Sequence, residues 1–466
     1  MSFQLELKDC VAPLQAQLVG NNSTLSGVSI DTRTIKPGDL YIAIVGERFN
    51  GHDFVHAAKD AGAAAIMIHE DVDCDLPQLK VGNTQSALGQ LGKFWAKRYA
   101  IPTIAITGSN GKTTVKEIIA SILGQIGPVL STRGNLNNEL GVPLTLLDMR
   151  KDHIYAVVEM GANHAGEIAR LVDLAEPDVA VVTNIGTAHL EGFGSVQGIA
   201  DAKSEIYAGL KSEGYGVINA DDQYVDVMRR ACAHCRVQEF GRSNASDVSV
   251  LPGNKLVIRY MGKRLTVQFG LSGEHNVMNA LAAIAAVECL GVDARFIELG
   301  LAAMEPVPGR LEKKAGHAGA LIIDDTYNAN PDSTRSAIKV LAAFSGKRFL
   351  VLGDMGELGS EALALHRSIG EFALAERLDG LWTTGELSLQ ACEAFHDRSA
   401  NQTEASRSTG GHFEDQQSLI DDLHAQLGSG VTVLVKGSRS SRMEGVVDGL
   451  VYKSSAPNVA SAGDRP

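Results

Sequence analysis

The chain has 466 residues, of which 44% are hydrophobic and 21% charged. This composition excludes a collagen-like, mucin-like or wholly disordered chain, and at roughly 150 residues per domain the length predicts about three domains. The 42 basic and 55 acidic residues give a formal net charge of −13 at pH 7. That charge argues against a general nucleic-acid binder, which neutralises phosphates with Lys and Arg.

We expect a cytoplasmic protein with no membrane insertion, because about 18 uninterrupted apolar residues occur nowhere. The longest candidate, residues 280–292, is interrupted by Glu288 and predicts a buried helix. The first residues lack the basic and apolar regions of a signal peptide, and six cysteines are too few for a disulfide scaffold. Cys232 and Cys235 form a CxxC pair, but no second pair at zinc-ribbon spacing accompanies them.

Residues 1–98 form a first block, in which short apolar runs at 40–45 and 63–68 alternate with turn-rich loops. The block ends in a stretch at 85–99 that predicts an amphipathic helix. Its apolar residues recur at helical spacing: Leu88, Leu91, Phe94 and Trp95.

The second block, residues 99–310, alternates apolar runs with helical patterns. Strands are predicted at 102–107, 155–159, 179–183 and 216–219, and helices at 113–123, 165–174, 199–210 and 275–290. This alternation predicts a mostly parallel sheet with helices on both faces. Alternating apolar residues at 248–269 predict a hairpin insert.

A linker at 305–310, with two prolines and a glycine, predicts the next domain boundary. Strands and helices alternate again in the third block, residues 311–454. The predicted strands lie at 320–324, 348–353, 380–384 and 431–435, and the helices at 334–344 and 363–375. Residues 455–466 predict a disordered tail. The sequence therefore predicts two α/β domains behind a smaller first domain.

A glycine-rich loop lies between the first strand and the first helix of the second block. Its residues are Thr107, Gly108, Ser109, Asn110, Gly111, Lys112, Thr113 and Thr114. In such a loop backbone N–H groups and the helix N-terminus face phosphate oxygens, while Lys112 adds a charge and Thr113 a hydroxyl for Mg²⁺. The generic phosphate-loop pattern has Gly at the position of Ile106, and a simple helix N-cap turn is the alternative. The flanking strand and helix favour nucleotide binding.

Three further residues are candidates for the same site. Glu159 is the last residue of a predicted strand, and ligands bind at the carboxyl ends of the strands in open α/β sheets. The alternative is that this carboxylate only caps a helix. His189 follows the strand at 179–185, but a single loop histidine is usually a surface residue. Lys203 would by default lie on a solvated helix face. Residue patterns alone do not decide these cases.

Together these segments resemble the Mur ligase family, the ATP-dependent amide-forming enzymes of peptidoglycan precursor synthesis. The loop at 107–114, Glu159 and His189 follow the family order, as do the later motifs His275-Asn276-x-x-Asn279-Ala280 and Gly309-Arg310. Five sequence strings resemble the branch of the family that adds D-alanyl-D-alanine, and they lie at 134–143, 159–162, 324–331, 353–359 and 436–439. Two segments of the first block are similar to uridine-nucleotide-binding segments, namely Asp31-Thr32-Arg33 and residues 49–54.

The resemblance implies a fold and a reaction. It implies an α/β protein with a small N-terminal UDP-substrate domain at 1–98, a central P-loop ATPase-like domain at 99–310 and a C-terminal Rossmann-like domain at 311–454. ATP would phosphorylate the carboxylate of a UDP-N-acetylmuramoyl-tripeptide, and the amine of D-alanyl-D-alanine would attack the acyl phosphate. We expect a monomer that closes over its ligands to exclude water.

The resemblance also implies roles for individual residues. Lys112 would neutralise phosphate charge, Thr113 and Glu159 would hold one Mg²⁺, and His189 a second, with Lys203 carbamylated by CO₂ as a further metal ligand. The implied nucleotide contacts beyond the loop are Asn276, Asn279, Arg310 and Asp325. The expected contacts with the UDP-linked substrate are Asp31, Thr32, Arg33, Asn50, Gly51, His52, Asn135 and Asn138. Our hypothesis for Asn328 and Asn330 is that they help to position the incoming dipeptide.

Some of these assignments have alternatives. Asn276 and Asn279, three residues apart, would face one side of a helix and read an adenine edge, or merely cap the helix. Asp325 would contact the ATP ribose or orient Arg310. For the whole chain, the alternatives are another acid–amine ligase, such as a folylpolyglutamate synthase relative, and a non-catalytic nucleotide-binding regulator. A P-loop sugar kinase would leave the third block unexplained.

Overall fold

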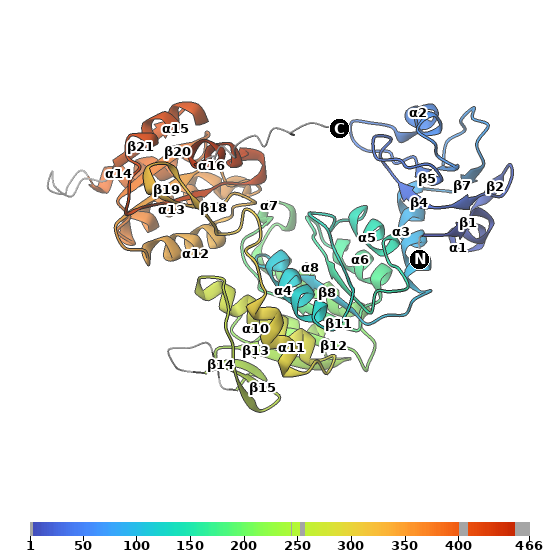
Figure 1. Cartoon of the computed structure of the whole chain (residues 1–466), viewed down its shortest axis with the longest axis horizontal. Coiled ribbons are helices and arrows are strands. Elements are labelled where there is room, and N and C mark those ends of the chain that lie inside the picture. Colours follow the sequence, from blue (N-terminus) through green and yellow to red (C-terminus); the bar gives the residue numbers. More distant parts are fainter. Residues whose placement is uncertain (1–2, 244, 252–256, 400–408, 453–466) are drawn as a thin grey trace, which may run out of the picture. The chain divides into compact units, whose positions relative to one another are not determined.

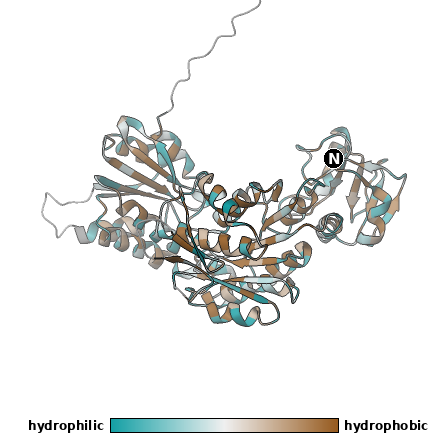
Figure 2. Cartoon of the chain, turned by 60° about the horizontal axis from the view of Figure 1, so that its bottom comes forward, coloured by the Kyte–Doolittle hydropathy of each residue, from teal (hydrophilic) through white to brown (hydrophobic). Residues whose placement is uncertain are grey.

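The computed structural model describes residues 3–243, 245–251, 257–399 and 409–452 (Figure 1), and the tail expected at 455–466 lies outside them. The chain divides into two compact units, unit 1 (Met1–Glu305) and unit 2 (Pro306–Pro466). Within each unit, hydrophobic residues concentrate in the strands (Figure 2). The expected α/β class with mostly parallel sheets is confirmed.

The first sheet of unit 1 is formed by residues of the first block. Its described strands lie in the order β2 (Gln17–Val19), β7 (Gln78–Lys80), β6 (Ala65–Ile68), β5 (Asp39–Ile42) and β4 (Gly27–Ser29). Strands β4 to β7 are parallel, and β2 is antiparallel. Beside this sheet lie a two-stranded pair and short helices: β1 (Leu5–Glu6), β3 (Thr24–Leu25), η1 (Leu7–Cys10), α1 (Val11–Leu14), η2 (Gly51–Phe54) and α2 (Val55–Asp60).

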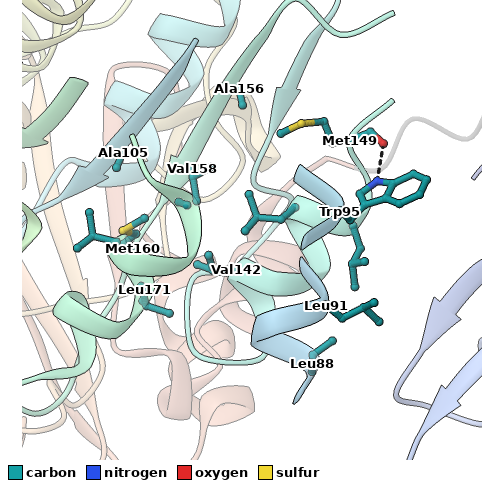
Figure 3. Packing of buried hydrophobic residues seen from close by; sticks show 14 of the residues in the cluster. Leu88, Leu91, Trp95, Ala105, Val142, Met149, Ala156, Val158, Met160 and Leu171 are labelled. Atoms are coloured by element: carbon teal, nitrogen blue, oxygen red, sulfur yellow. Dashed lines mark hydrogen bonds between the residues drawn. The ribbon is translucent and has the colours of Figure 1, made fainter. Parts of the chain in front are cut away.

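Helix α3 (Thr84–Ala96) confirms the predicted amphipathic helix and joins the first sheet to the rest of unit 1. It packs on α5 (Gly141–Leu147) and α6 (Glu167–Ala175). The indole Nε1 of Trp95 donates a hydrogen bond of 2.9 Å to the carbonyl of Met149 (Figure 3). One hydrophobic core therefore spans both parts of unit 1.

The second sheet carries the glycine-rich loop. Nine described strands lie in the order β16 (Lys263–Thr266), β15 (Val257–Tyr260), β14 (Val248–Leu251), β13 (Arg236–Gly241), β12 (Tyr215–Asn219), β11 (Val179–Val182), β8 (Thr103–Thr107), β10 (Tyr155–Glu159) and β9 (Val129–Ser131). All pairs from β9 to β14 are parallel, whereas β14, β15 and β16 are antiparallel. The expected hairpin insert is thus a three-stranded meander added to the sheet edge.

Helices cover this sheet as the alternation predicts. They are α4 (Lys112–Gly124), α7 (Leu190–Phe193), α8 (Val196–Ser204), η3 (Glu205–Gly209), α9 (Val225–Ala231), α10 (Glu274–Glu288) and α11 (Ala294–Ala302), besides α5 and α6. The helix predicted at 199–210 differs, because it begins earlier and changes to a 3₁₀ turn after Ser204. Helix α10 is buried, as expected, and no described helix is long and apolar enough to span a membrane.

Unit 2 contains one six-stranded sheet among its described residues. Its order is β17 (Glu312–Ala315), β18 (Leu321–Asp325), β22 (Val431–Lys436), β19 (Lys347–Leu352), β20 (Gly380–Thr384) and β21 (Thr409–Phe413). Only β17 is antiparallel to its neighbour. The helices are η4 (His317–Gly319), α12 (Pro331–Ala342), η5 (Gly359–Glu361), α13 (Ala362–Ala375), α14 (Leu389–Ser399), α15 (Gln416–His424), η7 (Arg439–Ser441) and α16 (Glu444–Leu450).

The close approach of α11 to α4 gives a test of this packing. A Cβ atom on Gly300 would lie 2.4 Å from the Cα atom of Ile122. We predict that Gly300→Ala lowers the free energy of unfolding by about 1–3 kcal/mol, because overpacking outweighs the better helix propensity of alanine. Gly124→Ala is the matched control, since Gly124 is exposed and no atom lies within 4 Å of its added Cβ. Denaturant unfolding of both variants measures the difference, and equal stabilities would contradict the packing.

Candidate active site

The glycine-rich loop begins where β8 ends, and two of its positions admit only glycine. Gly108 has φ of 147° and Gly111 has φ of 81°. A Cβ atom on Gly108 would lie 1.9 Å from Thr183 Oγ1, and one on Gly111 would lie 2.2 Å from Asn279 Oδ1. The loop therefore passes tightly between the end of β11 and helix α10.

Hydrogen bonds to the end of β11 hold this loop. The backbone N–H groups of Ser109 and Asn110 donate to the backbone carbonyl of Asn184 (2.9 Å) and to its side-chain oxygen (3.1 Å). The Thr183 hydroxyl donates to the Asn110 carbonyl at 2.6 Å. The loop conformation is thus set by protein contacts.

The first turn of α4 supplies the polar groups expected for phosphate binding. Lys112 Nζ donates to the carbonyl of Gly108 at 2.7 Å. Thr113 and Thr114 are buried, and the buried Thr107 hydroxyl donates to the carbonyl of Met160, which follows β10. The loop and the end of β10 are therefore adjacent.

Glu159 is the last residue of β10 and lies beside Ile106 in the sheet. Its side chain is only 2% exposed, so it does not act as a surface helix cap. Oε1 accepts a hydrogen bond of 2.8 Å from Asn137 Nδ2. Oε2 is buried and has no hydrogen-bond partner among the described residues. An unpartnered carboxylate oxygen next to a phosphate loop fits a magnesium ligand.

Lys203, on α8, is completely buried, so the default expectation of a solvated helix face is wrong. Its Nζ has no hydrogen-bond partner in the described part of the chain and lies 5.7 Å from the ring centre of Phe193. Burial, and then repulsion by Lys112, hold the pKa of Lys203 well below its ordinary value. A neutral amine at this position is chemically competent to react with CO₂.

His189 precedes α7 in the loop that follows β11, with a left-handed φ of 61°. The side chain is half-buried rather than fully exposed. Asp222 holds the same loop, because its carboxylate accepts the N–H of Ile185 at 2.7 Å. Loops after β8 and β11 and the end of β10 thus meet at one sheet edge, where α/β proteins bind ligands.

Asn276 and Asn279 lie on one face of α10, as their spacing predicts. Both are buried, and Asn279 Nδ2 donates to Asn276 Oδ1 at 3.1 Å. Asn276 Nδ2 in turn donates to the carbonyl of Ser272. Because a Cβ atom added to Gly111 would collide with the Asn279 side chain, the pair lies beside the phosphate loop.

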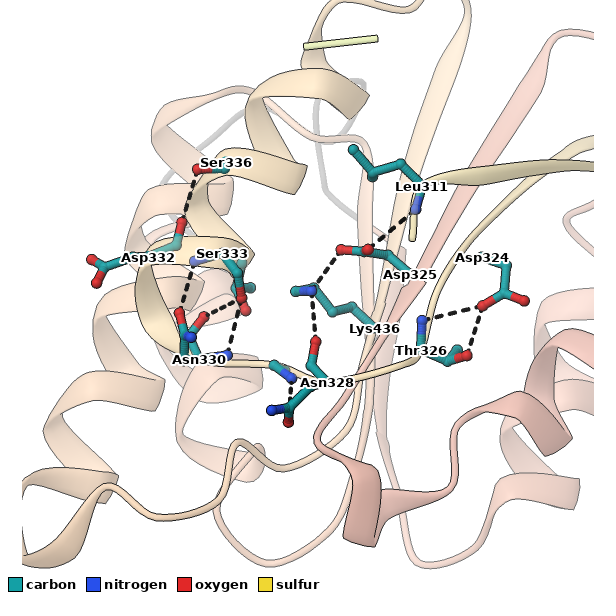
Figure 4. Close-up of polar contacts among 12 residues, drawn as sticks. Leu311, Asp324, Asp325, Thr326, Asn328, Asn330, Asp332, Ser333, Ser336 and Lys436 are labelled. Atoms are coloured by element: carbon teal, nitrogen blue, oxygen red, sulfur yellow. Dashed lines mark hydrogen bonds and ion pairs between the residues drawn. The ribbon is translucent and has the colours of Figure 1, made fainter. Parts of the chain in front are cut away.

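In unit 2, Asp325 ends β18 and is paired with a buried lysine. Lys436 Nζ lies 2.6 Å from Asp325 Oδ2 and donates to the carbonyl of Asn328 at 2.9 Å (Figure 4). Asp325 Oδ1 accepts the N–H of Leu311. The guanidinium carbon of Arg310 lies 4.2 Å from the ring centre of Tyr327, which follows β18.

Asn330 and Asn328 shape the loop between β18 and α12. Asn330 caps α12, since its side chain accepts the N–H of Ser333 and the two residues form a capping box. The Asn328 side chain accepts the N–H of Ala329. Both side chains therefore stabilise the backbone of this loop and the start of α12, in addition to any contact with a ligand.

At the first sheet, the predicted uridine-binding residues lie on loops after β4 and β5. The Asp31 carboxylate pairs with Arg33 at 2.6 Å, and Thr32 is half-buried between them in the chain. Gly51 leaves no room for a Cβ, which would lie 2.6 Å from the backbone nitrogen of Ile44.

His52 is buried and ties two loops together. Its Nε2 accepts the backbone N–H groups of His69 (3.1 Å) and Glu70 (3.4 Å), and its Nδ1 lies 2.7 Å from Asn50 Oδ1. Nε2 therefore provides the lone pair and Nδ1 carries the proton. Although His52, His69 and Glu70 lie close enough to surround an ion, His52 has no lone pair left for a metal.

Asn135 and Asn138 lie on the loop between β9 and α5, and both are exposed. Asn138 Oδ1 accepts the N–H groups of Leu140 and Gly141, at the start of α5. Their neighbour Asn137, which the motifs did not single out, is the one that contacts Glu159.

Comparisons with known proteins agree with this geometry. Three family models match in order: the Mur ligase family catalytic domain at 24–95, the Mur ligase middle domain at 106–287 and the Mur ligase glutamate ligase domain at 309–439. The UDP-N-acetylmuramoyl-tripeptide–D-alanyl-D-alanine ligase of Escherichia coli is 41% identical over 446 residues, covering 94% of this chain and 96% of that protein. The chain belongs to the Mur ligase family.

Solved structures extend this similarity. The MurF structure from Acinetobacter baumannii is 34% identical, with a TM-score of 0.89, and covers 96% of this chain and 98% of that one. MurF ligase from Thermotoga maritima, solved with ADP, is 31% identical, with a TM-score of 0.79 and coverages of 91% and 96%. A folylpolyglutamate synthase of Mycobacterium tuberculosis, at 19% identity and a TM-score of 0.62, shares the fold alone. The expected Mur ligase resemblance is confirmed.

The structure of this Mur ligase family member also adds residues that the sequence motifs did not assign. Lys436 and Tyr327 lie in the strings 436–439 and 324–331 that resemble the family, but the sequence assigned neither residue a role. Neither ion pairing nor ring stacking between segments distant in the chain is visible in a local pattern. Asn137 is one of three asparagines within the four residues 135–138, and nothing in the sequence distinguishes it from the other two.

The buried His52 predicts a dependence of stability on pH. Burial lowers the pKa of His52 in the folded state. Above the unfolded-state pKa of about 6.5 both states are neutral, and below it the unfolded state takes up a proton more readily, so stability falls as pH decreases toward the folded pKa.

We expect His52→Gln to show a smaller loss of unfolding free energy between pH 7.5 and pH 5 than the unchanged protein. The difference is about 1.4 kcal/mol for each unit by which the pKa is lowered. The control is His56→Gln, at an exposed histidine of α2, which should leave the slope unchanged. Identical slopes in all three proteins would contradict the neutral, buried His52.

Proposed function

We propose that the chain uses ATP to join D-alanyl-D-alanine to UDP-N-acetylmuramoyl-tripeptide, which gives the pentapeptide, ADP and phosphate in peptidoglycan precursor synthesis. The observation that carries this proposal is the full-length similarity to ligases of that name, at up to 41% identity. The phosphate loop and the buried Glu159 supply the matching chemistry.

The first chemical problem is that a carboxylate must attack a triphosphate, although both are anions. Lys112 and the N–H groups at the start of α4 reduce this repulsion and stabilise charge on the transferred phosphoryl group. The carboxylate oxygen bonds to the γ-phosphorus and ADP leaves. The dipeptide amine then attacks the acyl carbon, phosphate leaves, and the amide forms with loss of a proton.

Thr113, Glu159 and His189 are the proposed magnesium ligands. The unpartnered Oε2 of Glu159 and the buried hydroxyl of Thr113, both at the phosphate-loop edge, support this assignment. When bound, Mg²⁺ supplies positive charge to phosphate and carboxylate oxygens. Two such sites are proposed, with His189 at the second.

Lys203 is the proposed site of a carbamate. In its neutral form the Lys203 amine would form a C–N bond to CO₂ and release one proton, which converts the buried amine into an anionic metal ligand. The lowered pKa and the missing hydrogen-bond partner of Lys203 support this assignment.

The remaining contacts are assigned by position. For ATP we propose the loop at 107–114, Asn276 and Asn279 for the adenine edge, and Arg310 and Asp325 of unit 2. For the tripeptide nucleotide we propose Asp31, Thr32, Arg33, Asn50, Gly51, His52, Asn135 and Asn138. Asn328 and Asn330 are proposed to position the dipeptide.

The organisation of the protein follows the same proposal. We propose domain boundaries at 98/99 and 310/311, a monomeric enzyme and a cytoplasmic location, where ATP and the UDP-linked precursor occur together. The break between the two compact units at Glu305 and Pro306 supports a boundary close to 310.

Phosphate release from ATP, with UDP-N-acetylmuramoyl-tripeptide present, tests the function. We expect release to require D-alanyl-D-alanine and to accompany a product heavier by the dipeptide. Single D-amino acids, L-lysine and glutamate serve as control amines. Release without dependence on the dipeptide would overturn the proposed acceptor.

Lys203 gives a second test, because a carbamate requires CO₂. We expect the rate in CO₂-depleted buffer to fall and to recover when bicarbonate is added. The activity of Lys203→Ala should be lower by a factor of about 100 or more, and it should not respond to bicarbonate. Unchanged activity in Lys203→Ala would refute the carbamate.

A further inference from the structure

The segment after β9 continues alongside its parallel neighbour β10 and is hydrogen-bonded to the end of that strand. Thr132 Oγ1 accepts the backbone N–H of Glu159 at 2.9 Å. Thr132 is 1% exposed, and its carbonyl accepts a hydrogen bond of 2.7 Å from Lys116 Nζ on α4. The segment is thus joined both to the helix of the phosphate loop and to the strand that carries Glu159.

Asn137 adds a contact to the Glu159 side chain itself. Its Nδ2 donates to Oε1 at 2.8 Å, while its own backbone is held on both sides. The Asn137 carbonyl accepts the N–H of Gly161 at 2.7 Å, and its N–H donates to the carbonyl of Asn135 at 2.8 Å. The amide therefore has a well-defined position from which to donate.

Gly161 leaves the space that this amide occupies. A Cβ atom at residue 161 would lie 3.0 Å from Asn137 Oδ1 and 3.2 Å from Nδ2. A residue with a side chain there would push the amide away from Glu159. Two independent features, a hydrogen bond and a missing side chain, therefore favour the same arrangement.

The consequence is that the two oxygens of Glu159 are not equivalent. Oε1 is occupied by Asn137, whereas Oε2 is buried without a hydrogen-bond partner among the described residues. An amide donor on one oxygen fixes the rotation of the carboxylate and leaves the other oxygen to bind a cation.

We propose that Asn137 is a positioning residue, which holds Glu159 so that Oε2 is presented to the metal ion that accompanies the nucleotide. This inference rests on the proposed function, in which Glu159 is a metal ligand. Asn137 contacts neither substrate nor metal in this role and acts through Glu159.

The test measures Mn²⁺ binding to the ADP complex of the full chain by electron paramagnetic resonance of free Mn²⁺. We expect Asn137→Ala to weaken Mn²⁺ binding by about 10-fold or more, as loss of hydrogen bonds to metal ligands generally does. Gly161→Ala should weaken it less. ADP binding in the presence of EDTA should stay unchanged in both variants. The Mg²⁺ concentration needed for half-maximal activity should rise in the same order.

Asn22→Ala is the matched control. Asn22 also donates its amide to a carboxylate, that of Glu6 at 2.5 Å, but this hydrogen bond is exposed and lies in the first block. Mn²⁺ binding in this variant should equal that of the unchanged protein.

The outcomes separate the inference from the proposed function. Mn²⁺ affinity of Asn137→Ala within twofold of the unchanged protein would overturn the role of Asn137 alone. The same holds if ADP binding in EDTA falls as much as Mn²⁺ binding, because the damage is then general. An unchanged protein whose ADP complex binds no Mn²⁺ would overturn the metal role of Glu159 and the inference with it.

Discussion

Strand β8 is paired on one side with β10 and on the other with β11, and the site depends on this pairing. The N–H of Met160 donates to the Ile106 carbonyl at 2.8 Å, and the N–H of Thr183 donates to the Thr107 carbonyl at 3.0 Å. Because parallel strands end at one edge, these bonds bring together segments that are far apart in the chain. A shift of β10 by one residue would turn Glu159 to the other face of the sheet.

The same edge keeps polar groups away from water. Glu159 Oε2 and Lys203 Nζ are buried without hydrogen-bond partners among the described residues, and such groups cost free energy in the folded protein. The apolar strands around them offset this cost. Groups that are already desolvated and held in place need less reordering when charged ligands arrive. Buried polar groups that destabilise the fold in this way are typical of functional sites.

In the first sheet and in unit 2, residues proposed to contact ligands also shape the loops that carry them. His52 accepts two backbone N–H groups, and Asn330 caps α12. Short polar side chains near strand ends satisfy loop backbone groups in this way. The buried pair of Lys436 and Asp325 similarly joins the ends of β22 and β18. Loop shape and ligand contact are therefore carried by overlapping sets of residues.

The sequence by itself determined the α/β class, the family and the position of most long elements, because strand and helix periodicity and contiguous motifs are local properties. In the second sheet and in unit 2 it missed the strands β9, β13, β17 and β21, which are short or contain few consecutive apolar residues, and it predicted no helix at α11 or α14. Only the tertiary structure decided that Lys203 is buried, since its surroundings come from α7 and the phosphate loop. It also decided that Asn137, and not Asn135 or Asn138, donates a hydrogen bond to the Glu159 side chain, because neighbouring asparagines become distinguishable only when the chain lies alongside the end of β10.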